Sequence, residues 1–160
     1  MENNGTIGVL KVRRRRLIIP ACDGTRVFSE MRKEYGEIYF VDQQTVQKNH
    51  VTKKVIVDVY KSVCDATFVQ MLAPFGNDLD RFCLTQHQID FFFRRHYYTC
   101  SFFKAPYGIF FLLKEKDQYV LANIRLHTFH YLSGLIFPLD HPFIWLAEHN
   151  PLLVLPQQVV

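Results

Sequence analysis

The stretch GIFFLLKEKDQYVLANIRL, residues 108–126, predicts a β-hairpin. Two apolar runs flank the polar triplet Glu115-Lys116-Asp117, whose composition suits a turn. In the second run, one set of alternate residues reads as the face toward the core: Val120, Ala122, Ile124, Leu126 and Thr128. The other set, from Leu121 to Phe129, is mixed. We therefore expect antiparallel strands from Gly108 onward.

Further strands are expected on both sides of this hairpin. Ser133-Gly134 suggests another hairpin turn that leads into LIFPL. The runs FIWLA (143–147) and LLVLP (152–156) are candidates for short C-terminal strands. Upstream, VTKKVIVDVYKSV (51–63) places valines at alternate positions, which predicts a strand with one buried face.

Two helices are predicted between these strands. In LTQHQIDFFFRRH (84–96), Thr85 and Gln88 form a capping box, and an apolar stripe follows at helical spacing. In CDATFVQMLAPFG (64–76), Asp65 or Thr67 caps a short helix that Pro74 and Gly76 end. This order predicts an α+β fold with two short-to-medium helices and a C-terminal antiparallel β-meander.

The length of 160 residues predicts one domain, residues 1–160. Residues 1–8 could instead be a flexible tail. Residues 1–16 hold five of the 19 basic and one of the 15 acidic residues, a net charge of +4, so the remaining residues balance at 14 each. Attraction of a polyanion would therefore come from this segment. A strand from about Ile7 to Leu17 would put Arg13 and Arg15 on one face and Arg14 and Arg16 on the other.

The sequence predicts a cytoplasmic protein without membrane attachment. Only Leu17, Ile18 and Ile19 follow the arginine run before Pro20, which is too short for a signal peptide, and no run approaches the ~20 apolar residues of a spanning helix. None of the four cysteines lies in a C-x-x-C pair, so we expect buried, reduced thiols: Cys22, Cys64, Cys83 and Cys100.

We expect no metal, no cofactor and no catalytic residue. A zinc site of His127, His141 and Glu148 would lack the usual pair of ligands on one element. Cys83 precedes a helix N-terminus, where a thiolate would be stabilised, but Phe82 and Leu84 flank it and favour a buried role. The sequence contains no G-x-S-x-G, H-E-x-x-H, G-x-G-x-x-G or glycine-rich phosphate loop.

Basic and aromatic residues offer a candidate nucleic-acid surface. The predicted sheet face with Arg125 and His127 also carries tyrosine and phenylalanine, on which bases could stack. Together with Arg13, Arg14, Arg15 and Arg16 it forms the candidate interface. The pair Arg94-Arg95 could clamp a phosphate, but a charged last turn of an amphipathic helix is the favoured interpretation.

Three segments span roughly the last 100 residues: DATFVQMLAPFGNDLDRFCLTQHQI, FFLLKEKDQYVLANI and FIWLAEHNPLLVLPQ. Together they resemble a family of small proteins from candidate-phylum (Patescibacteria-type) bacteria. Matching positions include Thr67-Phe68, Gln70, Leu79-Asp80-Arg81, Cys83 to Gln86, Trp145 and Ala147-Glu148. Ala66 replaces the usual glycine. No activity is assigned to the family, so the resemblance implies a bacterial cytoplasmic protein and no site residues.

Three functions follow in order of preference. The first is a non-enzymatic binding or interaction module, with a protein as the favoured partner. The second is a nucleic-acid-associated protein that uses the arginine run. The third is a hydrolase that depends on Cys83 or on histidine.

Overall fold

The computed structural model describes residues 5–28, 50–96, 108–126 and 132–158. Within them, seven strands form one mixed sheet in the order β1-β2-β3-β7-β4-β5-β6. Neighbouring strands pair antiparallel, except that β4 and β7 are parallel. The strands are β1 (Thr6–Ile7), β2 (Leu10–Ile19), β3 (Val55–Ser62), β4 (Ile109–Glu115), β5 (Gln118–Leu126), β6 (Leu132–Pro138) and β7 (Leu152–Pro156), and the α-helices are α2 (Phe68–Leu72) and α3 (Gln86–His96).

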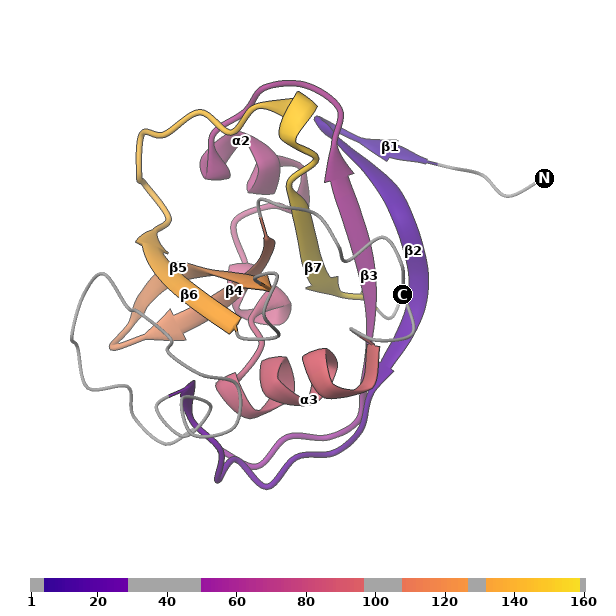
Figure 1. Ribbon diagram of the computed structural model, residues 1–160, viewed down its shortest axis with the longest axis vertical. Helices are drawn as coiled ribbons and strands as arrows, with labels where there is room; N and C mark the ends of the chain where they lie inside the picture. Colours follow the sequence, from indigo (N-terminus) through magenta and orange to yellow (C-terminus); the bar gives the residue numbers. More distant parts are fainter. Residues whose placement is uncertain (1–4, 29–49, 97–107, 127–131, 159–160) are drawn as a thin grey trace.

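Each face of the sheet is covered by its own apolar cluster. On one face, Ile89, Phe92 and Phe93 of α3 pack against side chains of β2, β3, β4, β5 and β7. On the other face, α2 and the 3-10 helix η2 (Leu79–Phe82) pack together with Trp145. Figure 1 shows α2 and α3 on opposite sides of the strands. The sheet therefore lies between two layers.

The central strands β4 and β7 are apolar at successive positions because both faces are covered. Phe111 and Val154 belong to the α3 cluster, and Phe110 and Leu153 belong to the α2 cluster. All five residues of β7 are buried. The rings of Phe92 and Phe111 meet edge to face, with their centroids 5.5 Å apart. These two strands form the middle of the core.

The hairpin predicted at residues 108–126 is confirmed. Glu115 pairs with Gln118, so Lys116 and Asp117 alone form the loop between β4 and β5. Both loop residues have positive φ, 45° and 66°, as a two-residue type I′ turn requires. This turn matches the right-handed twist of the paired strands.

Both predicted helices and their capping boxes are confirmed. In the cap of α3, Thr85 N donates to Gln88 Oε1 at 2.8 Å, and Gln88 N donates to Thr85 Oγ1 at 3.2 Å. At α2, Thr67 rather than Asp65 is the cap, and it exchanges the same two bonds with Gln70. The short helix passes into a 3-10 turn over Ala73–Phe75 and stops at Gly76, whose φ is 84°.

The α+β class is confirmed, but the prediction of a C-terminal antiparallel meander is wrong. Although β4, β5 and β6 pair antiparallel in sequence order, they belong to the larger mixed sheet that β7 joins to β3, β2 and β1. The turn predicted at Ser133-Gly134 is also wrong, because both residues lie inside β6 opposite Arg125 and Ile124. Since β7 returns between β3 and β4, a non-local pairing decides the topology.

Two smaller predictions are corrected by the second layer. In β3 the sequence indicated one buried face, yet Asp58 and Tyr60 on the other face are buried as well. The run FIWLA forms no strand, although Trp145 makes an isolated bridge with Ala66. LLVLP forms β7 as expected. Of the segment 1–8 considered as a tail, Thr6 and Ile7 pair with β2. Among the described residues, no helix has the length and apolarity to cross a membrane.

Candidate functional site

The four consecutive arginines lie on a strand near one edge of the sheet. We call Arg13–Arg16 of β2 the arginine edge. All four residues are exposed, whereas the flanking Val12 and Leu17 are buried. On the outer side of β2, the strand β1 pairs only with Leu10 and Lys11. The run is therefore presented to solvent by the fold.

Two β-bulges interrupt the pairing of β2 with β3 within this run. Val12 pairs with Tyr60, Arg14 with Val59 and Leu17 with Val57, so β2 holds one extra residue in each interval. The predicted regular alternation of Arg13 and Arg15 against Arg14 and Arg16 is therefore wrong. Each bulge reverses the direction of the side chains that follow, and the second restores the pattern before Leu17.

Asp58 fixes the second bulge from the neighbouring strand. Arg16 has a φ of 60°, a left-handed conformation that is costly for a residue with a Cβ atom. Its backbone N–H donates to Oδ1 of the buried Asp58 at 2.9 Å. The Gln157 amide donates to the same carboxylate at 3.3 Å, and the Arg15 guanidinium lies 3.9 Å from Oδ2. The carboxylate thus contacts both residues of β2 that lie opposite it in the bulge, Arg15 and Arg16.

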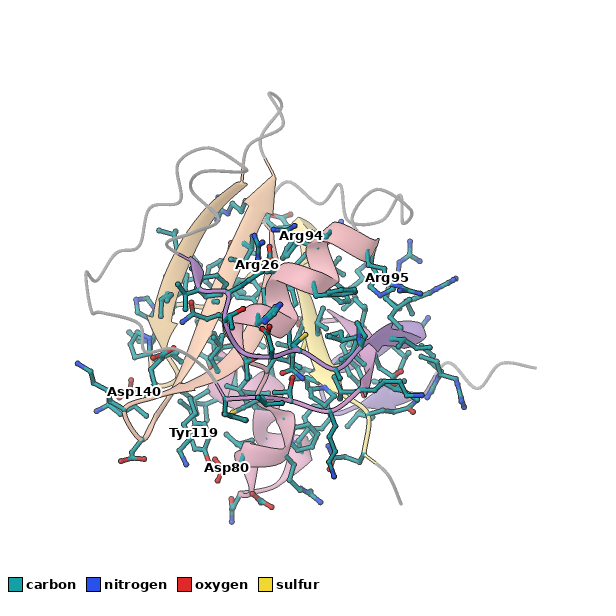
Figure 2. All side chains as sticks on the ribbon, turned by 90° about the horizontal axis from the view of Figure 1, so that it is seen from below. Arg26, Asp80, Arg94, Arg95, Tyr119 and Asp140 are labelled. Carbon is teal, nitrogen blue, oxygen red and sulfur yellow. The ribbon has the colours of Figure 1, made fainter. Side chains whose placement is uncertain are left out.

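The end of α3 meets β2 beside the arginine edge. His96 Nε2 lies 3.0 Å from the carbonyl oxygen of Ile18. Burial lowers the pKa of His96, and the charges of Arg95 and Arg14 lower it further. Figure 2 shows Arg95 turned away from Arg26 and Arg94, toward the side that carries β2. Arg95 therefore extends the arginine edge onto a second element.

The pair Arg94-Arg95 does not act as one clamp. Arg94 Nε lies 3.0 Å from the buried carboxylate of Asp90, and Arg26 Nε lies 2.7 Å from the same oxygen. Figure 2 shows Arg26 and Arg94 side by side. Two guanidinium groups on one carboxylate neutralise a charge that would be costly to bury alone. Only Arg95 of the pair is directed toward the arginine edge.

The structure does not bring Arg125 to the arginine edge. Arg125 lies on β5, four strand spacings from β2 in the sheet, or about 19 Å along it. Its Nε donates to Asn123 Oδ1 at 3.3 Å. His127 lies outside the described residues. The predicted interface thus separates into the arginine edge and a distant half-buried arginine.

A polar cleft of about 700 Å³ lies beside the start of α3. Tyr119 Oη and Lys114 Nζ donate to Asp80 Oδ1 at 2.7 and 3.0 Å, and these bonds lower the pKa of Asp80. Figure 2 shows Asp80 beside Tyr119. Two aspartates and two lysines line the cleft, so these charges balance: Asp80, Asp117, Lys114 and Lys116. Its wall combines hydrogen bonding with little net charge.

The thiol in this cleft is poorly suited to nucleophilic attack. Burial raises the pKa of Cys83 to about 12, and the charge of Asp80 raises it as well. Its Sγ contacts the Leu79 carbonyl oxygen at 3.4 Å. The thiolate that the helix N-terminus suggested is therefore scarce at neutral pH. Within the described part of the chain, no three His, Cys, Asp or Glu side chains gather as a metal site.

Sequence reasoning identified the arginine run but missed what shapes it. A bulge leaves no clear signal in a run of four identical residues, because every register gives the same pattern. Asp58 is polar inside a valine-rich strand, and that mismatch was the one available signal for a buried partner. The contribution of Arg95 depends on the packing of α3 against β2, which joins distant parts of the chain.

Known proteins supply no further indication of function. The chain matches no protein-family model, no curated protein and no solved structure. The arrangement of the arginine edge, Asp58 and Arg95 is therefore the basis for the function proposed next.

Proposed function

We propose that this chain is a non-enzymatic binding protein that holds the phosphate backbone of a nucleic acid with its arginine edge. The observation that carries the proposal is the exposure of all four residues Arg13–Arg16, with Arg95 at the end of α3 on the same side of the molecule as β2 (Figure 2). Guanidinium groups suit phosphate because their planar forks donate two parallel hydrogen bonds. Residues 1–16 hold the net charge of +4, so attraction is strongest where these groups lie.

An acidic peptide is a weaker candidate for the same surface. A peptide gains most of its affinity at a sheet edge by adding a strand through backbone hydrogen bonds. Here β1 pairs with Leu10 and Lys11, two bulges distort the arginine run, and the Ile18 carbonyl contacts His96. The arginine edge therefore offers a ligand charged side chains rather than a regular row of backbone hydrogen-bonding groups. A ligand read by its charge, such as a phosphate backbone, fits better.

The setting we propose is the bacterial cytoplasm. The resemblance to a candidate-phylum bacterial family supports a bacterial origin. Cys22, Cys64 and Cys83 are free thiols, which supports a reducing compartment.

The test is the salt dependence of binding to a short fluorescein-labelled DNA duplex, followed by anisotropy. We expect Arg13→Ala with Arg14→Ala to weaken binding at least tenfold, and to reduce the slope of log K against log salt by roughly 1.8. The matched control is Arg81→Ala with Lys116→Ala, which removes two exposed charges elsewhere and should leave binding nearly unchanged. Binding that ignores salt, or equal losses in both variants, would contradict the proposal. Labelled single-stranded RNA and unlabelled polyglutamate complete the series.

A protein partner is the second candidate, and two exposed apolar residues favour it. Phe143 and Ile144 are 52% and 54% exposed, and the Phe143 ring lies 4.7 Å from that of Trp145. A second copy of the chain is the partner that can be tested directly. Sedimentation velocity over a concentration series should show self-association that Phe143→Ser with Ile144→Ser abolishes. A monomer at every concentration argues against it.

A further inference from the structure

We infer that Asp58 is a positioning residue of the arginine edge, holding the bulge at Arg16 so that the arginines keep their exposed arrangement. This inference rests on the proposed function, since it concerns how the same surface is built. The carboxylate contacts no ligand in the proposed binding. It acts through the backbone of Arg16 and the side chain of Arg15.

The contacts of Asp58 are those expected of a bulge anchor, that is, a residue that holds a β-bulge in its conformation. The residue is 2% exposed, and its carboxylate accepts hydrogen bonds from Arg16 of β2 and from Gln157, just after β7, while the Arg15 guanidinium lies 3.9 Å away. A buried carboxylate persists only where hydrogen bonds and opposite charge offset its desolvation. The donor at the shortest distance is the backbone N–H of Arg16, at 2.9 Å. The shortest hydrogen bond of Asp58 is therefore with Arg16, the residue whose backbone is left-handed.

The left-handed conformation of Arg16 needs a contact that holds it in place, and Asp58 provides this contact. A non-glycine residue stays in the left-handed region only where its surroundings hold it there. Without an acceptor at Asp58, the Arg16 N–H would lose its partner and the left-handed conformation would lose its support. The extra residue would then shift, and the arginines of the interval between Arg14 and Leu17 would change direction relative to the rest of the strand. The number of arginines that reach one phosphate backbone would fall.

Charge and position predict opposite effects when Asp58 is replaced. Removal of a carboxylate beside four arginines raises the positive potential, so electrostatics alone predicts tighter binding of a polyanion. Loss of the bulge anchor predicts weaker binding. Asp58→Ala and Asp58→Asn remove the same charge, but Asn keeps an oxygen that can accept the Arg16 N–H. Comparison of these two variants therefore isolates the hydrogen-bond acceptor.

The experiment measures anisotropy of the labelled DNA duplex over a salt series for both variants. We expect Asp58→Ala to bind about fivefold to tenfold more weakly than Asp58→Asn, with a salt slope lower by about one phosphate contact. Asp58→Asn should bind as well as the wild type or better. Asp140→Asn, which removes an exposed carboxylate after β6, is the control and should leave the slope unchanged.

Glycine at position 16 provides the rescue, because glycine adopts the left-handed conformation without an anchor. Asp58→Ala should weaken binding in the Arg16 background and have little effect in the Arg16→Gly background. If Asp58→Ala alone does not fold, the comparison is Arg16→Gly against Asp58→Ala with Arg16→Gly. Binding of that double variant several-fold weaker than that of Arg16→Gly would mean that Asp58 does not act through the backbone of Arg16, and would overturn the inference.

The two proposals fail in different ways. If the wild type shows no salt-dependent binding to any probe, the proposed function is wrong. If the wild type binds, Arg13→Ala with Arg14→Ala weakens it, and Asp58→Ala binds as tightly as Asp58→Asn, only the role of Asp58 is wrong. Circular dichroism of each variant must show the wild-type content of secondary structure.

Discussion

The central strands β4 and β7 and the strand β2, which lies next to the short outermost strand β1, belong to one sheet but differ in regularity and burial. The central strands are regular, apolar and buried on both faces. Strand β2 contains two bulges, a left-handed arginine and four exposed charges between its buried ends. The comparison shows that core packing restricts the backbone of the central strands more strictly than the backbone of β2. In the centre any irregularity would open the core, whereas at the edge the backbone can depart from regular pairing at little cost in packing.

The largest effect is expected in the centre. Phe111→Ala should lower the free energy of unfolding by about 3–5 kcal/mol, because the side chain is fully buried against Phe92 and Phe93. Urea denaturation measures the change. Phe143→Ala is the control and should cost about 1 kcal/mol, since half of that side chain is already exposed. Equal losses at the two positions would mean that the centre does not carry most of the stability.

A smaller effect of opposite sign is expected at the edge. Arg16→Gly should leave the free energy of unfolding unchanged or raise it by up to about 1 kcal/mol, because glycine removes the cost of the left-handed conformation. Arg14→Gly removes the same charge at a residue without positive φ, and should lower stability by about 0.5–1 kcal/mol. Thermal denaturation of the pair compares them. A greater loss at Arg16 than at Arg14 would show that the bulge is unstrained.

The smallest effect is expected where the edge meets α3. The pKa of His96 lies below its ordinary value of 6.5 in the folded protein, mainly because of burial. Its neutral form therefore contributes stability that is present above about pH 6.5 and is lost as the pH falls through the folded pKa. His96→Gln, which keeps a donor for the Ile18 carbonyl, should lose less stability between pH 7 and pH 5 than the wild type.

Two features sharpen the pH measurement. The pKa of Glu115 is raised by burial, so its contribution has the opposite sign and is lost as the pH rises through its folded pKa. The difference between wild type and His96→Gln removes this contribution. His50→Gln alters an exposed histidine and serves as the control. If the stability of wild type and of His96→Gln changes equally between pH 7 and pH 5, protonation of His96 does not contribute to the loss of stability.

Local signals predicted the local structure well. Thr85 with Gln88 identified the start of α3, and the polar triplet at Glu115 identified the hairpin turn, because each feature depends on residues within four positions. The arrangement of the strands was not predictable in this way. Insertion of β7 between β3 and β4 depends on pairing across about 90 residues of chain, for which the sequence has no periodic signal. An apolar run that is buried between two layers also lacks the alternating pattern of a half-buried strand, so its sequence does not distinguish it from other buried segments.

The candidate site was predictable only as a composition. The run Arg13–Arg16 was evident as the source of net charge, but regular alternation assigned its residues to the wrong sides. The second bulge includes a hydrogen bond from Arg16 to Asp58, a residue more than forty positions away. Arg125 matched the composition of a binding surface, yet β3, β7 and β4 separate it from the arginine edge. Charge can be read from a sequence, but which charges act together depends on the tertiary structure.

The bulges of β2 also affect how the protein behaves at high concentration. A long, flat outer strand invites the sheets of other molecules to join it and grow into aggregates. Mutual repulsion of four arginines and a distorted backbone both oppose that joining. Replacing the whole run by neutral residues would therefore abolish ligand binding and would also make the protein more prone to aggregate. The surface that attracts a polyanion is the same one that keeps copies of this chain apart.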